Sequence, residues 1–180
     1  ARKNKGKFFL RIDDTDTTRS TDEYKDSIIS ALKQLGLNHD NDILYQSQRF
    51  DHYIDKIEEL LNNDMAYYDQ VEVNEKTKET DLSIKFENRL NRKGYVIRFK
   101  NQRESSIHID DSVHGEISFN PEIFFDAVIL RSNGVPTYNL TSVVDDIDLG
   151  ITHLIRGDDH LSNLPVQVNM FKSFNSKVPS

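Results

Sequence analysis

The chain has 180 residues, of which 36% are apolar and 29% charged, with a formal net charge of −7 and no cysteine. This is the composition of a soluble globular protein, and it excludes disulfides, thiol catalysis and cysteine-ligated zinc. No run approaches the roughly 18 apolar residues of a membrane span, and the negative charge argues against a protein that simply coats nucleic acid.

The first part of the chain predicts a strand followed by two helices. An apolar run over residues 8–12 is typical of a short buried strand. The pattern Ser20-x-x-Glu23 is a capping box that starts a helix, and Gly36 suits the position just after its end. A second helix is expected to begin near Ser47. This order is compatible with an α/β layer.

The middle of the chain changes character. Short alternating runs over residues 95–100, 107–110 and 116–119 predict a small antiparallel unit inserted between two α/β halves. The polar stretch 74–94 before them is interpreted as a helix. The third part returns to α/β, with strands over 126–130 and 152–157, a turn over 132–136, and helices over 138–150 and 161–174. Pro165 suits the first turn of the last helix.

Three carboxylates, Asp13, Asp14 and Asp16, follow the first strand directly. One interpretation is a polar loop, because Asp and Thr bond to nearby backbone N–H groups and acids favour a helix N-terminus. The other is a ligand site at the carboxyl end of a strand, where the carboxylate of Asp13 holds an ammonium group. A metal loop is disfavoured, because the glycine of the EF-hand spacing is absent.

A second charged loop follows the strand predicted over 152–157. Arg156 is suited to a carboxylate or phosphate, and Gly157 permits a close approach of backbone to a ligand, or an unusual turn. Asp159 can accept from a ribose hydroxyl, and His160 precedes the last helix. The alternative is a local Arg–Asp pair with helix caps. Taken together, one acidic loop and one loop led by Arg suit a zwitterionic amino acid.

Two further groups are candidates for binding. Tyr138 and Ser142 bring hydrogen-bonding groups to a helix start, although Tyr is more often a core or cap residue. Between residues 85 and 103 there are seven basic residues and one acidic residue, with Tyr95 and Phe99 interleaved. This run suits phosphates and bases, and its alternative is a solvated charged face.

Several motifs then resemble one family in order. The stretch "GKFFLRIDDTDTTRS" is similar to the "GKF-LRIEDTD--RS" signature of glutamyl-tRNA synthetases. The stretches "ILYQSQRFDHY", "HGEISF", "VILRSNGVPTYNL" and "VVDDIDLGITHLIRGDDHLSN" follow in the order of that family. The resemblance covers nearly the whole chain and is weakest between about residues 70 and 94.

The resemblance implies an α/β, Rossmann-like class I synthetase fold with an inserted α+β acceptor-stem-binding domain. Residues 1–68 and 126–180 would form the catalytic domain, and 69–125 the insertion. Such enzymes activate glutamate with ATP and Mg²⁺ to glutamyl-adenylate and transfer it to tRNA(Glu). A cytoplasmic, monomeric enzyme without membrane contact is expected.

By the same resemblance, glutamate contacts are assigned to Asp13, Tyr138, Ser142 and Arg156. ATP contacts are assigned to Gly157, Asp159 and His160, and tRNA contacts to Asp16, Arg89, Arg92, Arg98 and Lys100. Asp13 stands where many members have Glu, and Ser142 where some have Asn.

The chain also departs from the family. It lacks the H-x-G-H and K-M-S-K-S-like stretches that stabilise the ATP phosphates, so we expect a piece of a longer protein that is inactive alone. Some members carry a zinc site after "AYY", and without cysteine none is expected here. Two other functions stay open: a paralogue that glutamylates queuosine in tRNA(Asp), and a non-catalytic module that binds tRNA or a partner protein.

Overall fold

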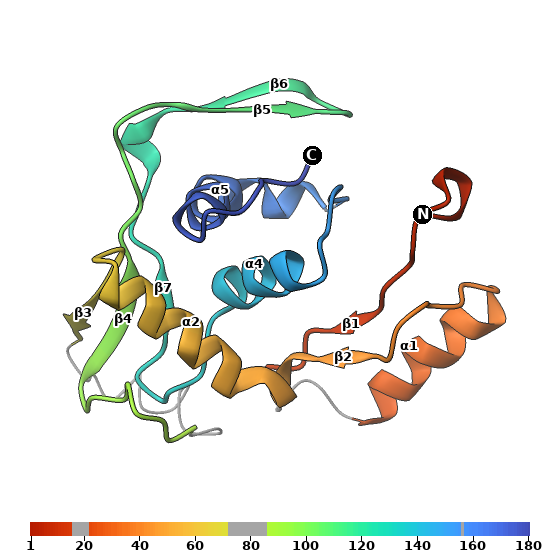
Figure 1. The fold of residues 1–180 in the computed structure, drawn as a ribbon, viewed down its shortest axis with the longest axis horizontal. Coiled ribbons are helices and arrows are strands. Elements are labelled where there is room, and N and C mark those ends of the chain that lie inside the picture. Colours follow the sequence, from red (N-terminus) through yellow and green to blue (C-terminus); the bar gives the residue numbers. More distant parts are fainter. Residues whose placement is uncertain (16–21, 72–85, 156) are drawn as a thin grey trace. The chain divides into compact units, whose positions relative to one another are not determined.

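The structure is a computed structural model that describes residues 1–15, 22–71, 86–155 and 157–180. The chain divides into two compact units, Ala1–Phe50 and Asp51–Ser180. Figure 1 labels their helices and strands.

The first unit contains a parallel pair of short strands and one long helix. Its elements are η1 (Arg2–Asn4), β1 (Arg11–Ile12), α1 (Asp22–Gln34), β2 (Leu44–Tyr45) and η2 (Gln46–Arg49). Arg11 pairs with Leu44 and Ile12 with Tyr45. The strand predicted over 8–12 is therefore confirmed only for its last two residues. The first half of the predicted capping box, Ser20, lies outside the described residues.

The end of α1 agrees with the sequence prediction. Gly36 has φ of 70°, a left-handed conformation that costs glycine little. The N–H of Leu37 donates to Leu32 O (2.9 Å) and that of Gly36 to Lys33 O (3.1 Å). These two bonds form a Schellman motif, which satisfies carbonyl groups that the helix end would leave unpaired.

The second unit is built on a three-stranded antiparallel sheet in the order β3-β4-β7. Its strands are β3 (Ala66–Gln70), β4 (Tyr95–Phe99) and β7 (Val128–Leu130). The strand predicted over 95–100 is thus confirmed for residues 95–99 and that over 126–130 for its last three residues, whereas β3 was not expected. The inserted domain was predicted over residues 69–125. Strand β3 spans the first boundary of that range, and β4, which lies within it, pairs with β7, which lies beyond its second boundary.

The helix α2 (Phe50–Asn62) follows η2 and carries a buried apolar stripe. Its fully buried side chains are Tyr53, Ile54, Ile57 and Leu60. The spacing of these residues puts them on one helical face. The helix expected to begin near Ser47 is therefore confirmed, with a 3-10 turn in front of it.

A separate hairpin is formed by β5 (Ile107–Asp111) and β6 (Gly115–Phe119), and η3 (Pro121–Ile123) follows it. At its tip, the Asp111 carboxylate accepts from the backbone N–H groups of Val113 and His114, both at 2.8 Å. Gly115 has φ of 76°, which the tight turn requires. Both predicted runs of this hairpin are confirmed.

The described residues of the second unit contain three further helical elements. The elements are α4 (Tyr138–Asp148), η4 (Asp158–Asn163) and α5 (Leu164–Ser173), with Pro165 in the first turn of α5 as predicted. Among the described residues, no helix is long and apolar enough to cross a membrane.

Two element predictions were wrong. Residues 152–155 form no strand, because within the described part of the chain their backbone makes only two ladder-like bonds: Leu154 N–H to Ser180 O (2.9 Å) and Ser180 N–H to Thr152 O (3.0 Å). Residues 86–94 form turns instead of a helix. There, Asn88 donates to Phe86 O and accepts from the N–H of Leu90, and such local side-chain bonds compete with helix formation. The part of that predicted helix before residue 86 lies outside the described residues.

Candidate active site

Asp13 follows β1, as the sequence predicted, but its carboxylate already has a partner. Arg11 Nε lies 2.6 Å from Asp13 Oδ1, and Arg11 Nη2 lies 3.2 Å from Oδ2. The Asp13 side chain remains 38% exposed. Because a carboxylate has about four acceptor sites, this forked pair leaves room for a ligand's ammonium group.

The neighbouring carboxylate, Asp14, has a structural role that the sequence analysis missed. It is 2% exposed, and it accepts from the Ser47 N–H (2.9 Å), the Ser47 hydroxyl (2.8 Å) and Lys25 Nζ (3.0 Å). Burial acts to raise the pKa of Asp14, but the bonds from Ser47 and Lys25 outweigh it and hold that pKa below 3.8. The charged side chain therefore ties the end of β1 to α1 and η2 within the first unit.

Two of the predicted site residues, Asp16 and Arg156, lie outside the described residues. The third acid of the first loop and the leading Arg of the second therefore stay predictions.

Tyr138 begins α4, and the fold positions it through the residue before it. Thr137 is the N-cap, and its hydroxyl donates to Val128 O of β7 (2.7 Å). This bond anchors the helix start to the sheet. Ser142, one turn later on the same face of α4, is fully buried, and its hydroxyl has no hydrogen-bond partner in the described part of the chain. A buried hydroxyl is rarely left unpaired, so Ser142 is a candidate for a ligand contact.

The start of η4 brings the second predicted loop to Tyr138. The imidazole of His160 lies against the Tyr138 ring, with ring centroids 5.3 Å apart and planes tilted by 40°. His160 Nδ1 is buried, and among the described residues it has no hydrogen-bond partner. Asp159 is largely exposed, with one carboxylate oxygen 3.8 Å from His160 Nε2. Two predicted contacts, one for glutamate and one for ATP, thus lie together.

Gly157 does not adopt an unusual turn. Its φ of −70° and ψ of 153° are ordinary extended backbone, so the expectation of an unusual conformation was wrong. A Cβ added at this position would lie 2.5 Å from Asp159 Oδ1. Close approach of a ligand to the backbone is the remaining reason for glycine here.

A buried pair behind the site also escaped the sequence analysis. The Tyr53 hydroxyl donates to both carboxylate oxygens of Asp145, at 2.9 and 3.0 Å, and neither residue is exposed. Because Tyr53 lies on α2 and Asp145 on α4, the pair joins these helices. The pair therefore fixes α4, the helix that carries Tyr138 and Ser142, to α2.

Most of the basic run has acidic partners. Arg89 lies 2.6 Å from Asp55 Oδ1 and 2.7 Å from Glu58 Oε2, and these carboxylates, Glu58 most of all, raise the pKa of its guanidinium. Arg98 pairs with Asp69, and Lys100 with Asp64.

Arg92 differs from these residues. Its guanidinium lies over the ring of Tyr68, 3.7 Å from the centroid, and in the described part of the chain no acidic group pairs with it. Of the residues assigned to tRNA and described here, Arg92 has its charge least compensated.

No group of three or more His, Cys, Asp or Glu side chains is arranged to hold a metal ion among the residues that the structure describes.

Comparison with known proteins agrees with the motifs. The family described as "tRNA synthetases class I (E and Q), catalytic domain" matches residues 1–180. A glutamate–tRNA ligase of Francisella tularensis subsp. tularensis (strain WY96-3418) is 42% identical over 193 residues, which cover 99% of this chain and 41% of the relative. Glutamate–tRNA ligase 1 of Helicobacter pylori (strain G27) is 43% identical over 194 residues, which cover 100% and 42%.

Solved structures give the same result. The crystal structure of a glutamate tRNA ligase from Elizabethkingia meningosepticum, in complex with its amino acid, has a TM-score of 0.81 and 26% identity. The match covers 98% of this chain and 42% of that one. The expected class I catalytic fold is therefore confirmed. The chain spans about two fifths of the length of these relatives.

Proposed function

The chain belongs to the catalytic-domain family of the class I tRNA synthetases for glutamate and glutamine, and from that premise we propose that it is the catalytic core of a glutamate–tRNA ligase. The full-length protein would use ATP to activate glutamate to glutamyl-adenylate and transfer it to tRNA(Glu). The proposal is supported by relatives that bear this name and cover 99% or more of the chain. It includes a monomeric, cytoplasmic enzyme without zinc.

One observation carries the assignment of the site: the contact of Tyr138 with His160, together with two buried polar atoms, Ser142 Oγ and His160 Nδ1, that have no hydrogen-bond partner among the described residues. Unpaired buried polar atoms are costly, and a polar ligand satisfies them. Tyr138 and Ser142 line the glutamate side, and His160 with Gly157 and Asp159 lines the ATP side.

The charges suit a zwitterion. Asp13 attracts the ammonium group of glutamate, and Arg156 attracts a carboxylate. Catalysis then consists of holding the glutamate carboxylate in line with the α-phosphorus of ATP, because a well-oriented attack removes much of the entropic barrier. The carboxylate oxygen forms the new bond to phosphorus and pyrophosphate leaves. Mg²⁺, when bound with ATP, offsets the negative charge on the phosphates.

The test is attachment of glutamate to purified tRNA by the full-length protein with ATP and Mg²⁺. Charging of tRNA(Glu) is the expected result. Glutamate on queuosine-containing tRNA(Asp) instead, or on neither tRNA, would overturn the proposal in favour of the modifying paralogue or the binding module.

Adjacent carboxylates supply a matched pair of variants. Asp13→Asn keeps the shape of the side chain but removes its charge, so kcat/KM for glutamate should fall about 100-fold, as for the loss of a charge-assisted bond. Asp14→Asn removes the same charge one residue away, where it ties structure together. It should lower Tm and change kcat/KM for glutamate far less.

A further inference from the structure

Two successive residues at the start of α4 contact η4 and α5. The Tyr138 ring lies against His160 of η4, and the side chain of Asn139 bonds to that of Gln167 in α5. In this bond, Gln167 Nε2 donates to Asn139 Oδ1 over 3.0 Å. The ring contact belongs to the proposed site, whereas neither amide of the second contact has been assigned to a substrate.

The amide of Gln167 lies in the interior of the second unit, where α4 and α5 pack against each other. Gln167 is 2% exposed, and the α5 residues on both sides of it are buried as well. Asn139 is half-buried. A buried amide costs stability unless its polar atoms are hydrogen-bonded. The bond to Asn139 therefore helps to satisfy a group that the folded protein would otherwise tolerate poorly.

This bond also gives the contact between α4 and α5 a direction. The burial of apolar side chains is favourable but non-directional. A hydrogen bond, in contrast, weakens steeply when its distance or angle changes, and it is electrostatically stronger inside a protein than in water. The amide pair therefore favours one position of α4 relative to α5.

That relative position matters because the two sides of the proposed site lie on different elements. Tyr138 and Ser142, on the glutamate side, belong to α4. Asp159 and His160, on the ATP side, belong to η4, which continues directly into α5 at Leu164. A bond between the start of α4 and α5 thus sets the distance between the glutamate side and the ATP side.

We propose that Asn139 and Gln167 are positioning residues for the activation step. Their bond sets α4 against η4 and α5, and so places the glutamate carboxylate in line with the α-phosphorus of ATP. The inference rests on the proposed function and adds two residues to it. Because neither amide touches a substrate in this role, their loss should lower kcat for adenylate formation while each substrate keeps its contacts and its KM.

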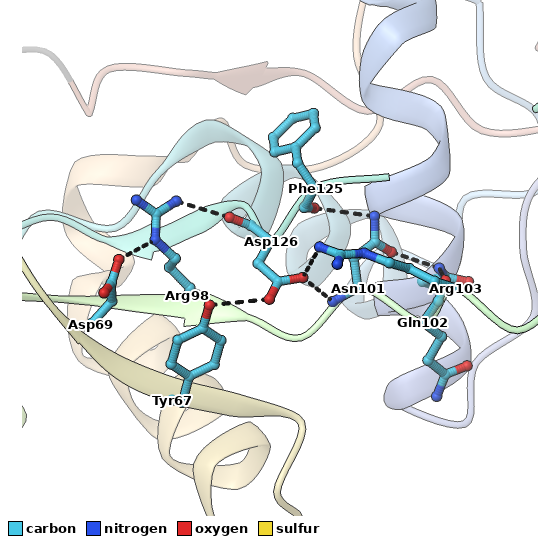
Figure 2. A network of polar contacts seen from close by, with 9 residues as sticks. Tyr67, Asp69, Arg98, Asn101, Gln102, Arg103, Phe125 and Asp126 are labelled. Carbon is cyan, nitrogen blue, oxygen red and sulfur yellow. Dashed lines mark hydrogen bonds and ion pairs between the residues drawn. The ribbon is translucent and has the colours of Figure 1, made fainter. Parts of the chain in front are cut away.

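A second buried amide of α5 supplies a matched control. Asn169 is 3% exposed and donates through Nδ2 to Asn101 Oδ1 (2.6 Å) and to Gln102 O (3.0 Å). Asn101 belongs to the polar network in Figure 2, where its backbone N–H donates to the Asp126 carboxylate (3.1 Å). This amide ties α5 to the chain after β4 instead of to α4, so its loss should cost stability without separating the two sides of the site.

The experiment measures pyrophosphate exchange by the full-length protein, with tRNA(Glu) present and with glutamate and ATP varied in turn. Gln167→Met and Asn169→Leu each replace a buried amide of α5 by an apolar side chain of similar size, so both should lower Tm. In Gln167→Met, kcat should fall about tenfold, since a misplacement of about 1 Å can cost as much as 100-fold. Both KM values should change less than about twofold. In Asn169→Leu, kcat and both KM values should stay within about twofold of the unmutated protein.

Asn139→Ala removes the same bond from its half-buried side, where a substitution disturbs folding less, and it decides the question if Gln167→Met does not fold. It should also lower kcat about tenfold with both KM values kept. The double variant of Asn139→Ala and Gln167→Met should fall no further, because the two changes remove one bond.

An equal fall of kcat in Gln167→Met and Asn169→Leu would overturn the inference, because a general loss of stability would then be the cause. A rise in KM with kcat unchanged, an unchanged kcat, or effects that multiply in the double variant would contradict it as well. Failure of the proposed function looks different: the unmutated protein itself would then show no exchange, and the inference would fall with the function.

Discussion

The ring of Tyr138 lies against the imidazole of His160, with centroids 5.3 Å apart, and this contact joins the start of α4 to η4. The two residues are separated by 22 positions that include the loop after α4. Each was assigned to a different ligand from the sequence, and their contact puts the amino-acid side and the nucleotide side of the proposed site next to each other.

Nδ1 of His160, which has no hydrogen-bond partner among the described residues, gives the first prediction. His160→Phe keeps a ring against Tyr138 but removes Nδ1, so KM for ATP should rise about tenfold, as for the loss of one hydrogen bond of about 1.4 kcal/mol. Tm should stay within about 2 °C of the unmutated value. Pyrophosphate exchange at varied ATP measures this. An unchanged KM would mean that His160 only packs against Tyr138.

Ser142 gives a prediction in which glutamate binding weakens while stability does not fall. Ser142→Ala removes a buried hydroxyl without a partner among the described residues, so Tm should not fall, while KM for glutamate should rise about threefold. The neighbouring Thr141 is the control, because its hydroxyl donates to Tyr138 O (3.3 Å). Thr141→Val should lower Tm. A lower Tm in Ser142→Ala would contradict the role as a ligand contact.

Gly157 tests close approach of the nucleotide. In Gly157→Ala the added methyl meets only the end of the exposed Asp159 side chain, which can rotate away, and φ is already ordinary, so Tm should not change. Because we expect the nucleotide to contact the backbone at this glycine, KM for ATP should rise about tenfold. Gly150→Ala is the control, since φ of 61° strains any side chain there. It should lower Tm and leave KM for ATP unchanged.

Some arginines of the basic run over residues 85–103 already pair with acidic side chains, and this predicts which of them contacts RNA. Arg92→Ala should lower the slope of log affinity for tRNA against log salt by about 0.7 to 0.9, the amount for one phosphate contact. Arg89→Ala should change the slope less, because Asp55 and Glu58 already compensate that charge. Filter binding at several salt concentrations checks this. Equal effects of the two variants would contradict it.

Asp14 predicts a loss of stability in acid. Its pKa in the folded protein is below 3.8, so its contribution is complete above pH 3.8 and is lost as the pH falls through the lower folded value. Asp14→Asn should therefore lower the free energy of unfolding by about 2 kcal/mol at pH 7, and by much less at pH 2. Urea unfolding at both pH values measures the difference. A constant difference would show that charge is not the cause.

The elements whose structure depends on neighbouring residues were predicted well. The end of α1 at Gly36, the helix expected to begin near Ser47 and the two strands of the β5–β6 hairpin each depend on residues within a few positions, and each agrees with the structure. The failures were of a different kind. Residues 152–155 find too few backbone partners for a strand in the part of the chain that the structure describes, and Asn88 bonds to its own neighbours where a helix was expected.

The sequence by itself determined the family, the order of most elements and the candidate residues at two loops, because ordered motifs and periodic patterns are local and survive without a structure. Which side chains form hydrogen bonds with one another was decided only by the tertiary structure. Asp14 meets Ser47 across 33 positions, Asn101 meets Asn169 across 68, and Tyr53 meets Asp145 across 92. Such pairs form where packing brings distant segments together, and burial then makes each unpaired polar group costly. No spacing in one sequence encodes that choice.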